Sequence, residues 1–314
     1  MSSGRQIVGL VDMAVALMGR AQKTHPTGDP KFSVMQAFPA TVAAAESDPF
    51  LMCDHFGPTL SKGVAKHPDE FPIPWHPHRG MDILTYLTRG VGRHGDSLGN
   101  REEFATPGMQ WISVGSGIEH AEGGGTPAGQ MMEGFQIWVN VPSDRKMDDP
   151  RYGTEAPESI PNIDYGGVSA RLLAGSLGGH KGPFNTVQPV QIVDFCLDPN
   201  RTHRHEIPAE LDNAILYVSQ GAGSINGVSV DQHGVVRLDA SDPKLRGVTL
   251  AASGSGLNVI CFAGKRLNQP IAWHGPFVMT TQEEIRQTLS EYRNGAFLRK
   301  RAAWDYKDVS TKPA

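Results

Sequence analysis

The chain has 314 residues, of which 39% are hydrophobic, and this is enough to bury a sizeable core and favours two domains over one. Its formal net charge is -4 and its basic residues are scattered, so the electrostatics argue against direct binding to nucleic acid. The 36 glycines and 23 prolines imply many turns at short intervals, which is typical of an all-β fold.

The N-terminal apolar run and the cysteines bear on location. Residues 7–19 are too short a run to span a bilayer, and Asp12 interrupts them, so we interpret this run as a strand or buried segment. The three cysteines are far apart and form no CxxC pair, which predicts neither a disulfide framework nor a thiolate zinc site. We therefore expect a cytoplasmic protein with no membrane partner.

Two series of extended segments follow along the chain. The first comprises strands at 82–90, 109–122 and 134–142, the second of these broken at glycines 115–117; the later series lies at 190–199, 213–221, 234–240 and 257–264. Between the two series, residues 143–157 are charged and proline-bearing, as linkers often are. We therefore place an N-terminal domain at 1–148 and a C-terminal domain at 149–314.

An internal sequence similarity and a terminal helix complete the predicted fold. Residues 214–227 (AILYVSQGAGSING) echo residues 83–96 (ILTYLTRGVGRHGD), which favours two stacked β-domains of similar architecture. Residues 280–295 differ, because Thr281 and Glu284 have the spacing of a capping box and the apolar side chains that follow share one helical face. We expect a short C-terminal helix that packs against the domains.

Two histidines in the stretch FPIPWHPHRGMDI suggest a metal site. Prolines precede and separate His76 and His78, so this segment cannot be helical and is expected to be extended. In an extended chain, residues two apart point to the same side. The two imidazoles therefore project together, as a metal ion would require.

A second same-face pair lies further along, in GIEHAEGGG. His120 and Glu122 are again two apart, and His120 follows His78 by 42 residues, enough for a strand, a hairpin and a return to the same place. Three imidazoles and a carboxylate suit Fe(II), Mn(II), Ni(II), Co(II) or Cu(II), whereas zinc, which is possible, prefers a closed tetrahedral site. An octahedral ion would keep two positions open for a chelating substrate, or for substrate and dioxygen.

Several motifs together resemble the pirin family of bicupins: DPFLMCDHFGP, HPHRGMDILTYLTRG, HGDSLGN, PGMQWISVGSGIEHAE and GPFVMTTQEEIRQTLSEYRNGAF. The resemblance runs in order from about Phe32 to about Phe297. It implies two stacked cupin domains of the double-stranded β-helix (jelly-roll) type. It also implies one mononuclear divalent metal, Fe(II) before the alternatives, in the N-terminal cupin on His76, His78, His120 and Glu122, with the C-terminal cupin usually empty.

Four other histidines and one arginine are interpreted more simply. His203 and His205 share a face in THRH, but no later histidine completes a ligand set, so we expect a solvent-exposed loop pair. His55 is expected to be a hydrogen-bonded structural residue. His94 and Asp96 are candidates for the cavity mouth, for a partner of a ligating ring or for a plain loop, and Arg79 either holds a carboxylate near the site or fixes a loop.

Three functions fit the predicted metal site and fold. The first is a metal-dependent dioxygenase acting with dioxygen on a small flavonol-like aromatic enol, since some members of the resembled family are similar to quercetin 2,3-dioxygenases; Glu122 would then be both ligand and base. The second is a non-enzymatic, iron-containing redox-sensing regulator that modulates a protein partner. The third is a metal-stabilised fold without activity. An open cavity beside the metal favours the enzyme.

Overall fold

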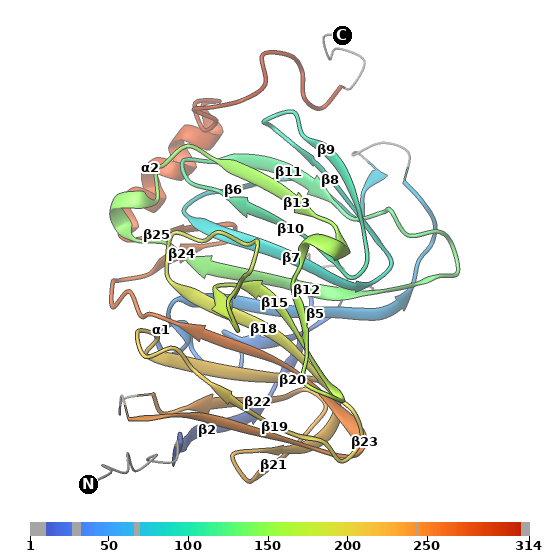
Figure 1. Cartoon of the computed structure of the whole chain (residues 1–314). Helices are drawn as coiled ribbons and strands as arrows, with labels where there is room; N and C mark the ends of the chain where they lie inside the picture. Colours follow the sequence, from blue (N-terminus) through green and yellow to red (C-terminus); the bar gives the residue numbers. More distant parts are fainter. Residues whose placement is uncertain (1–10, 27–32, 66–69, 241, 243, 309–314) are drawn as a thin grey trace, which may run out of the picture.

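Strands form most of the computed structural model, which describes residues 11–26, 33–65, 70–240, 242 and 244–308. They lie in two stacked halves (Figure 1). The first half is built on a seven-stranded antiparallel sheet whose spatial order is β13 (Arg151–Glu155), β10 (Gly108–Ser113), β7 (Met81–Arg89), β12 (Met131–Asn140), β5 (Phe50–Leu60), β4 (Val34–Phe38) and β3 (Gln22–Thr24). A four-stranded sheet completes it, with the order β6 (Ile73–His78), β11 (Ile118–Glu122), β8 (Val91–Asp96) and β9 (Arg101–Ala105).

The second half is built on a ten-stranded sheet. Its main path is β14 (Asn162–Asp164), β15 (Val168–Ala174), β18 (Val190–Leu197), β23 (Leu245–Gly264), β20 (Asn213–Ile225), β22 (Gly234–Leu238) and β2 (Val15–Arg20). Two further strands, β1 (Val11–Asp12) and β19 (Thr202–Glu206), pair with β23, and β21 (Val228–Asp231) pairs with β20. The two series of predicted strands are therefore confirmed, including the break between β10 and β11.

Short elements fill the connections between these sheets. Two-stranded ribbons are formed by β16 (Ser176–Leu177) with β17 (His180–Lys181) and by β24 (Ala272–His274) with β25 (Phe277–Met279). The helical elements are α1 (Ala44–Ser47), η2 (Ser143–Arg145), η3 (Pro157–Ser159) and α2 (Gln282–Arg293). Helix α2 confirms the predicted capping box, because Thr281 accepts a hydrogen bond from the Glu284 amide and Glu284 reaches back to the Thr281 amide.

The seven-stranded sheet presents different residues on its two faces. Leu84 and Tyr86 on β7 point toward the second half, where they join an apolar layer shared by both halves. Within that layer the Phe262 ring of β23 lies 5.3 Å from Phe38 and 5.5 Å from Phe50, centroid to centroid. Because side chains alternate along a strand, Thr85 points the other way, into the interior of the first half. The stacking thus buries one face and leaves the other to form a cavity.

Both ends of the described chain cross to the opposite half. Strand β2 pairs with β22 in the second half, whereas α2 and the β24–β25 ribbon lie against the first (Figure 1). Residues 151–155, expected to belong to a linker, instead form β13 and pair with β10. The charged side chains of this segment are compatible with a strand because β13 lies at the edge of the sheet, where it has a neighbouring strand on one side only. The domain boundary between residues 148 and 149 stays a prediction. Within the described residues, no helix is long and apolar enough to cross a membrane.

Candidate metal centre

Strands β6 and β11 bring three of the predicted ligands together. They pair antiparallel, with His120 opposite His76 and Ile118 opposite His78. One ring nitrogen from each of His76, His78 and His120 lies within 4.8 Å of the other two. The Nε2 atoms of His76 and His120 are 2.9 Å apart. Two nitrogens each about 2.1 Å from one ion and at right angles would be about 3.0 Å apart, so the spacing fits a metal centre.

Backbone carbonyls orient two of these rings. His76 Nδ1 lies 2.7 Å from the Pro74 carbonyl and His78 Nδ1 lies 3.2 Å from the Pro276 carbonyl. A carbonyl only accepts, so each Nδ1 must donate and each Nε2 keeps its lone pair for a metal. His78 Nε2 is buried without a hydrogen-bond partner among the described residues. An unpartnered buried nitrogen beside two others is the environment that a bound cation would satisfy.

Burial also keeps these histidines neutral. Desolvation lowers the pKa of His76, and it holds the pKa of His78 and His120 well below the usual value, with neighbouring imidazoles adding to the effect. Neutral imidazole is the form that binds metals. The cluster of three histidines could therefore hold a metal ion.

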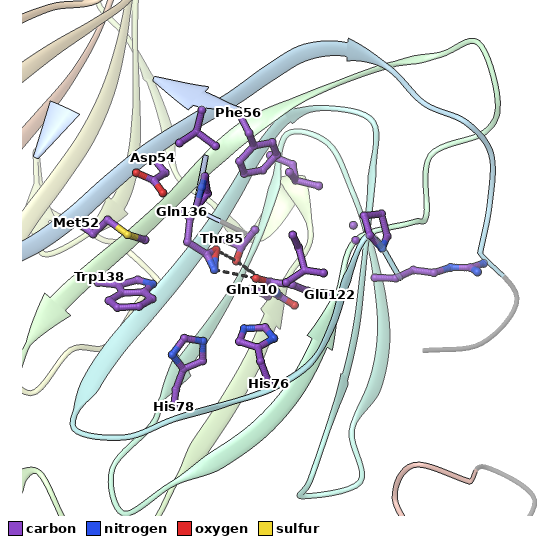
Figure 2. Close-up of a pocket in the computed structure, with 18 of the residues that line it drawn as sticks. Met52, Asp54, Phe56, His76, His78, Thr85, Gln110, Glu122, Gln136 and Trp138 are labelled. Atoms are coloured by element: carbon purple, nitrogen blue, oxygen red, sulfur yellow. Dashed lines mark hydrogen bonds between the residues drawn. The ribbon is translucent and has the colours of Figure 1, made fainter. Parts of the chain in front are cut away.

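Glu122 faces the same interior but is not one of the three clustered ligands. A register shift in the pairing of β11 with β6 falls between His120 and Glu122, and such irregularities redirect side chains. Gln110 Nε2 donates to one carboxylate oxygen and Gln136 Nε2 to the other, each at 2.8 Å (Figure 2). Burial is the main cause that raises the Glu122 pKa to about 7. Its role as fourth ligand stays a prediction.

Two of these histidines, His76 and His78, open into a cavity of about 580 Å³. His76, His78 and Glu122 line it together with Thr85, Gln110 and Gln136, while most of the remaining wall is apolar and includes Met52, Phe56 and Trp138 (Figure 2). Trp273 lines it as well. A mainly apolar cavity with a few convergent polar groups is typical of a small-molecule site. Sequence reasoning missed the glutamines and the threonine, which only cross-strand register brings beside Glu122.

Arg79 anchors the C-terminal segment outside the cavity. It is 1% exposed, and its guanidinium donates to the Ser116 carbonyl at 2.8 Å, to Glu291 on α2 at 2.7 Å and to the Phe297 carbonyl at 2.9 Å. Of the two predicted alternatives, Arg79 thus fixes a loop, because the carboxylate that it holds belongs to Glu291 on α2 and does not line the cavity. The strand that carries His76 and His78 is thereby tied to α2.

Two other histidine predictions are resolved by their contacts. His94 Nε2 lies 3.1 Å from Asp96 Oδ2 in a buried pair, and the His94 ring centroid is 5.5 Å from that of His120. Both residues lie on β8 beside the ligand cluster, so they neither line the cavity nor form a plain loop, and among the described residues no hydrogen bond joins either of them to a ligating ring. His55 is confirmed as a hydrogen-bonded structural residue, because its ring nitrogens contact Tyr217 of the second half and Glu133.

The expectation of an exposed loop for His203 and His205 was wrong. Both lie on β19, which pairs with β23. His205 is 3% exposed, and its Nε2 is 2.8 Å from Gln191 Oε1. The His203 ring packs between Tyr165 and Phe195. The sequence shows alternation at this point but not the neighbouring strands that cover it.

Family profiles cover most of the chain. The profile described as Pirin matches residues 31–139, and that of the Pirin C-terminal cupin domain matches residues 192–298. The fold is thus a bicupin with a C-terminal helix, and the ligand cluster lies in its first cupin. The chain belongs to the pirin family.

Relatives and a solved structure agree with this assignment. A protein of Pseudomonas aeruginosa named "Putative quercetin 2,3-dioxygenase" is 30% identical over 91% of this chain and 98% of its own length. A pirin-like protein of Solanum lycopersicum is 34% identical over 79% of this chain and 81% of its own. The crystal structure of a quercetin 2,3-dioxygenase from Acinetobacter baumannii has a TM-score of 0.80 at 26% identity, covering 92% of this chain and 99% of that one.

Proposed function

We propose that this protein is a metal-dependent dioxygenase that opens a ring of a flavonol-like aromatic enol. The observation that carries the proposal is the cavity, which joins a cluster of metal-competent histidines to a mainly apolar space large enough for a small ligand. A redox sensor that only reports metal state needs no such space. The names of the Pseudomonas aeruginosa relatives and of the Acinetobacter structure support the same class of reaction.

The proposed metal is Fe(II), with Ni, Mn, Co, Cu and Zn as alternatives, since affinity alone does not fix which ion is bound. His76, His78 and His120 would hold it, with Glu122 as the fourth ligand. When bound, the ion would lower the pKa of a chelating enol hydroxyl and favour electron transfer toward dioxygen.

Glu122 is the proposed base that accepts the enol proton. Burial raises its pKa to about 7, and a bound cation would in turn favour the ionised carboxylate, which is the form that accepts a proton. Gln110 and Gln136 hold one carboxylate oxygen each, so the group is positioned before the substrate arrives. Thr85 supports this arrangement, because its hydroxyl is 2.7 Å from Gln136 Oε1.

Aromatic side chains would position the substrate rings. Trp138 packs beside His78, with ring centroids 5.1 Å apart, and Trp273 lies 5.8 Å from Trp138. Both indoles line the cavity and present flat apolar surfaces next to the ligand cluster. Such walls favour a planar aromatic ligand and exclude water from the reacting oxygens.

Oxygen uptake by protein loaded anaerobically with Fe(II) and offered quercetin tests the proposal, with Glu122→Gln measured beside it. We expect uptake matched to flavonol loss in the native protein and at least a hundredfold lower rate in the variant. Metal content is measured in both proteins, so that loss of the ion is distinguished from loss of the base. Native protein with full metal and no uptake would refute the enzyme and redirect the search to a protein partner.

A further inference from the structure

A continuous row of polar side chains crosses the cavity face of the seven-stranded sheet. Its members sit directly opposite one another on five neighbouring strands, from β4 through β5, β12 and β7 to β10. Residues in direct register project from the same face. In spatial order the row is Gln36, Asp54, Gln136, Thr85 and Gln110. Three members of the row donate hydrogen bonds to the Glu122 carboxylate, namely Gln136, Thr85 and Gln110.

Asp54 is the charged member of this row and takes no part in holding Glu122. It lines the cavity although it is only 3% exposed, and Gln36 Nε2 donates to its Oδ1 at 2.8 Å. Among the described residues no basic side chain forms an ion pair with it, and Gln36 provides the one hydrogen bond found to its carboxylate. A buried carboxylate has capacity for several hydrogen bonds and costs free energy when they are not made. Desolvation accordingly raises the Asp54 pKa to about 6.

The row also fixes how far Asp54 lies from the proposed reaction centre. Thr85, whose hydroxyl is 3.2 Å from the Glu122 carboxylate, is two strands away from Asp54 in the sheet. Neighbouring strands are about 4.8 Å apart, so the two positions are separated by about 10 Å. Figure 2 shows Asp54 on the far side of Gln136 from His76 and His78. Two linked aromatic rings bridge a separation of this size.

We propose that Asp54 determines substrate specificity by accepting a hydrogen bond from a second hydroxyl group, carried at the far end of an aromatic chelator whose enol oxygens face His76, His78 and Glu122. This inference rests on the proposed function and deepens it. It predicts that polyhydroxylated aromatic enols are preferred over analogues that have only the chelating oxygens. A carboxylate acceptor suits this task, because hydrogen bonds to charged groups are stronger than those between neutral groups.

Anaerobic binding tests the inference without turnover. Metal-loaded native protein and Asp54→Asn are titrated with quercetin and with 3-hydroxyflavone, which has the same chelating oxygens and no other hydroxyl. Quenching of tryptophan fluorescence reports binding, because Trp138 and Trp273 line the cavity. We expect the substitution to weaken quercetin binding roughly five- to tenfold and to leave 3-hydroxyflavone binding within about twofold.

The matched ligand controls for folding of the variant, and Asp231→Asn, on the exposed surface of the second half, controls for a general charge effect. Equal quercetin affinity in native protein and Asp54→Asn, or an equal loss for both ligands, would overturn the role of Asp54. Selective binding without oxygen uptake would support Asp54 while removing the dioxygenase proposal. Failure of native protein to bind either flavonol would refute both.

Discussion

Replacing Arg79 by methionine should separate the C-terminal helix from the metal-binding half. The substitution keeps an unbranched side chain of similar length but removes every donor from a site that is 1% exposed. Two backbone carbonyls, those of Ser116 and Phe297, and the carboxylate of Glu291 would each lose a hydrogen bond of 2.7 to 2.9 Å. Breaking a buried ion pair from one side costs about 3–5 kcal/mol, and we expect a loss of unfolding free energy in that range.

The assay is urea unfolding of native protein, Arg79→Met and Arg286→Met, with hydrogen exchange of α2 measured in parallel. Arg286 is a matched control on the same helix, since its ion pair with Glu283 joins two exposed side chains and is worth at most about 1 kcal/mol. Exchange should accelerate in α2 of Arg79→Met before the sheets open. A loss below about 1 kcal/mol, or equal losses in the two variants, would show that Arg79 does not anchor α2.

Three further outcomes are expected. His78→Ala should lose most of the bound metal while His205→Ala keeps it; equal metal content by elemental analysis would refute the ligand assignment. Chelation should lower the melting temperature of native protein but leave His78→Ala unchanged, because only a bound ion adds stability. Burial lowers the His205 pKa to about 4, so the unfolded chain binds more protons and stability should fall by up to about 3 kcal/mol as pH drops from 6.5 to 4. The free energy of unfolding of His205→Gln should depend less on pH over that range. An unchanged pH dependence would contradict this cause.

The sequence by itself determined the strand pattern and the shared side of His76 and His78, because both depend on short-range geometry, whereas the pairing of β6 with β11 brings His120 to them. Prolines exclude a helix around His76 and His78, and the two-residue period of an extended chain then places both imidazoles on one side. The same local logic predicted the capping box of α2. These features need only residues a few positions apart.

The tertiary structure alone decided what surrounds those ligands. Asp54, Thr85, Gln110 and Gln136 lie on four strands, and no local pattern reveals which of their residues stand opposite one another. The carbonyl that orients His78 belongs to Pro276, 198 residues away, because the C-terminal ribbon returns to the first cupin. His205 was misjudged for the same reason, since a segment expected to be an exposed loop forms a strand that pairs with β23, and His205 is buried there.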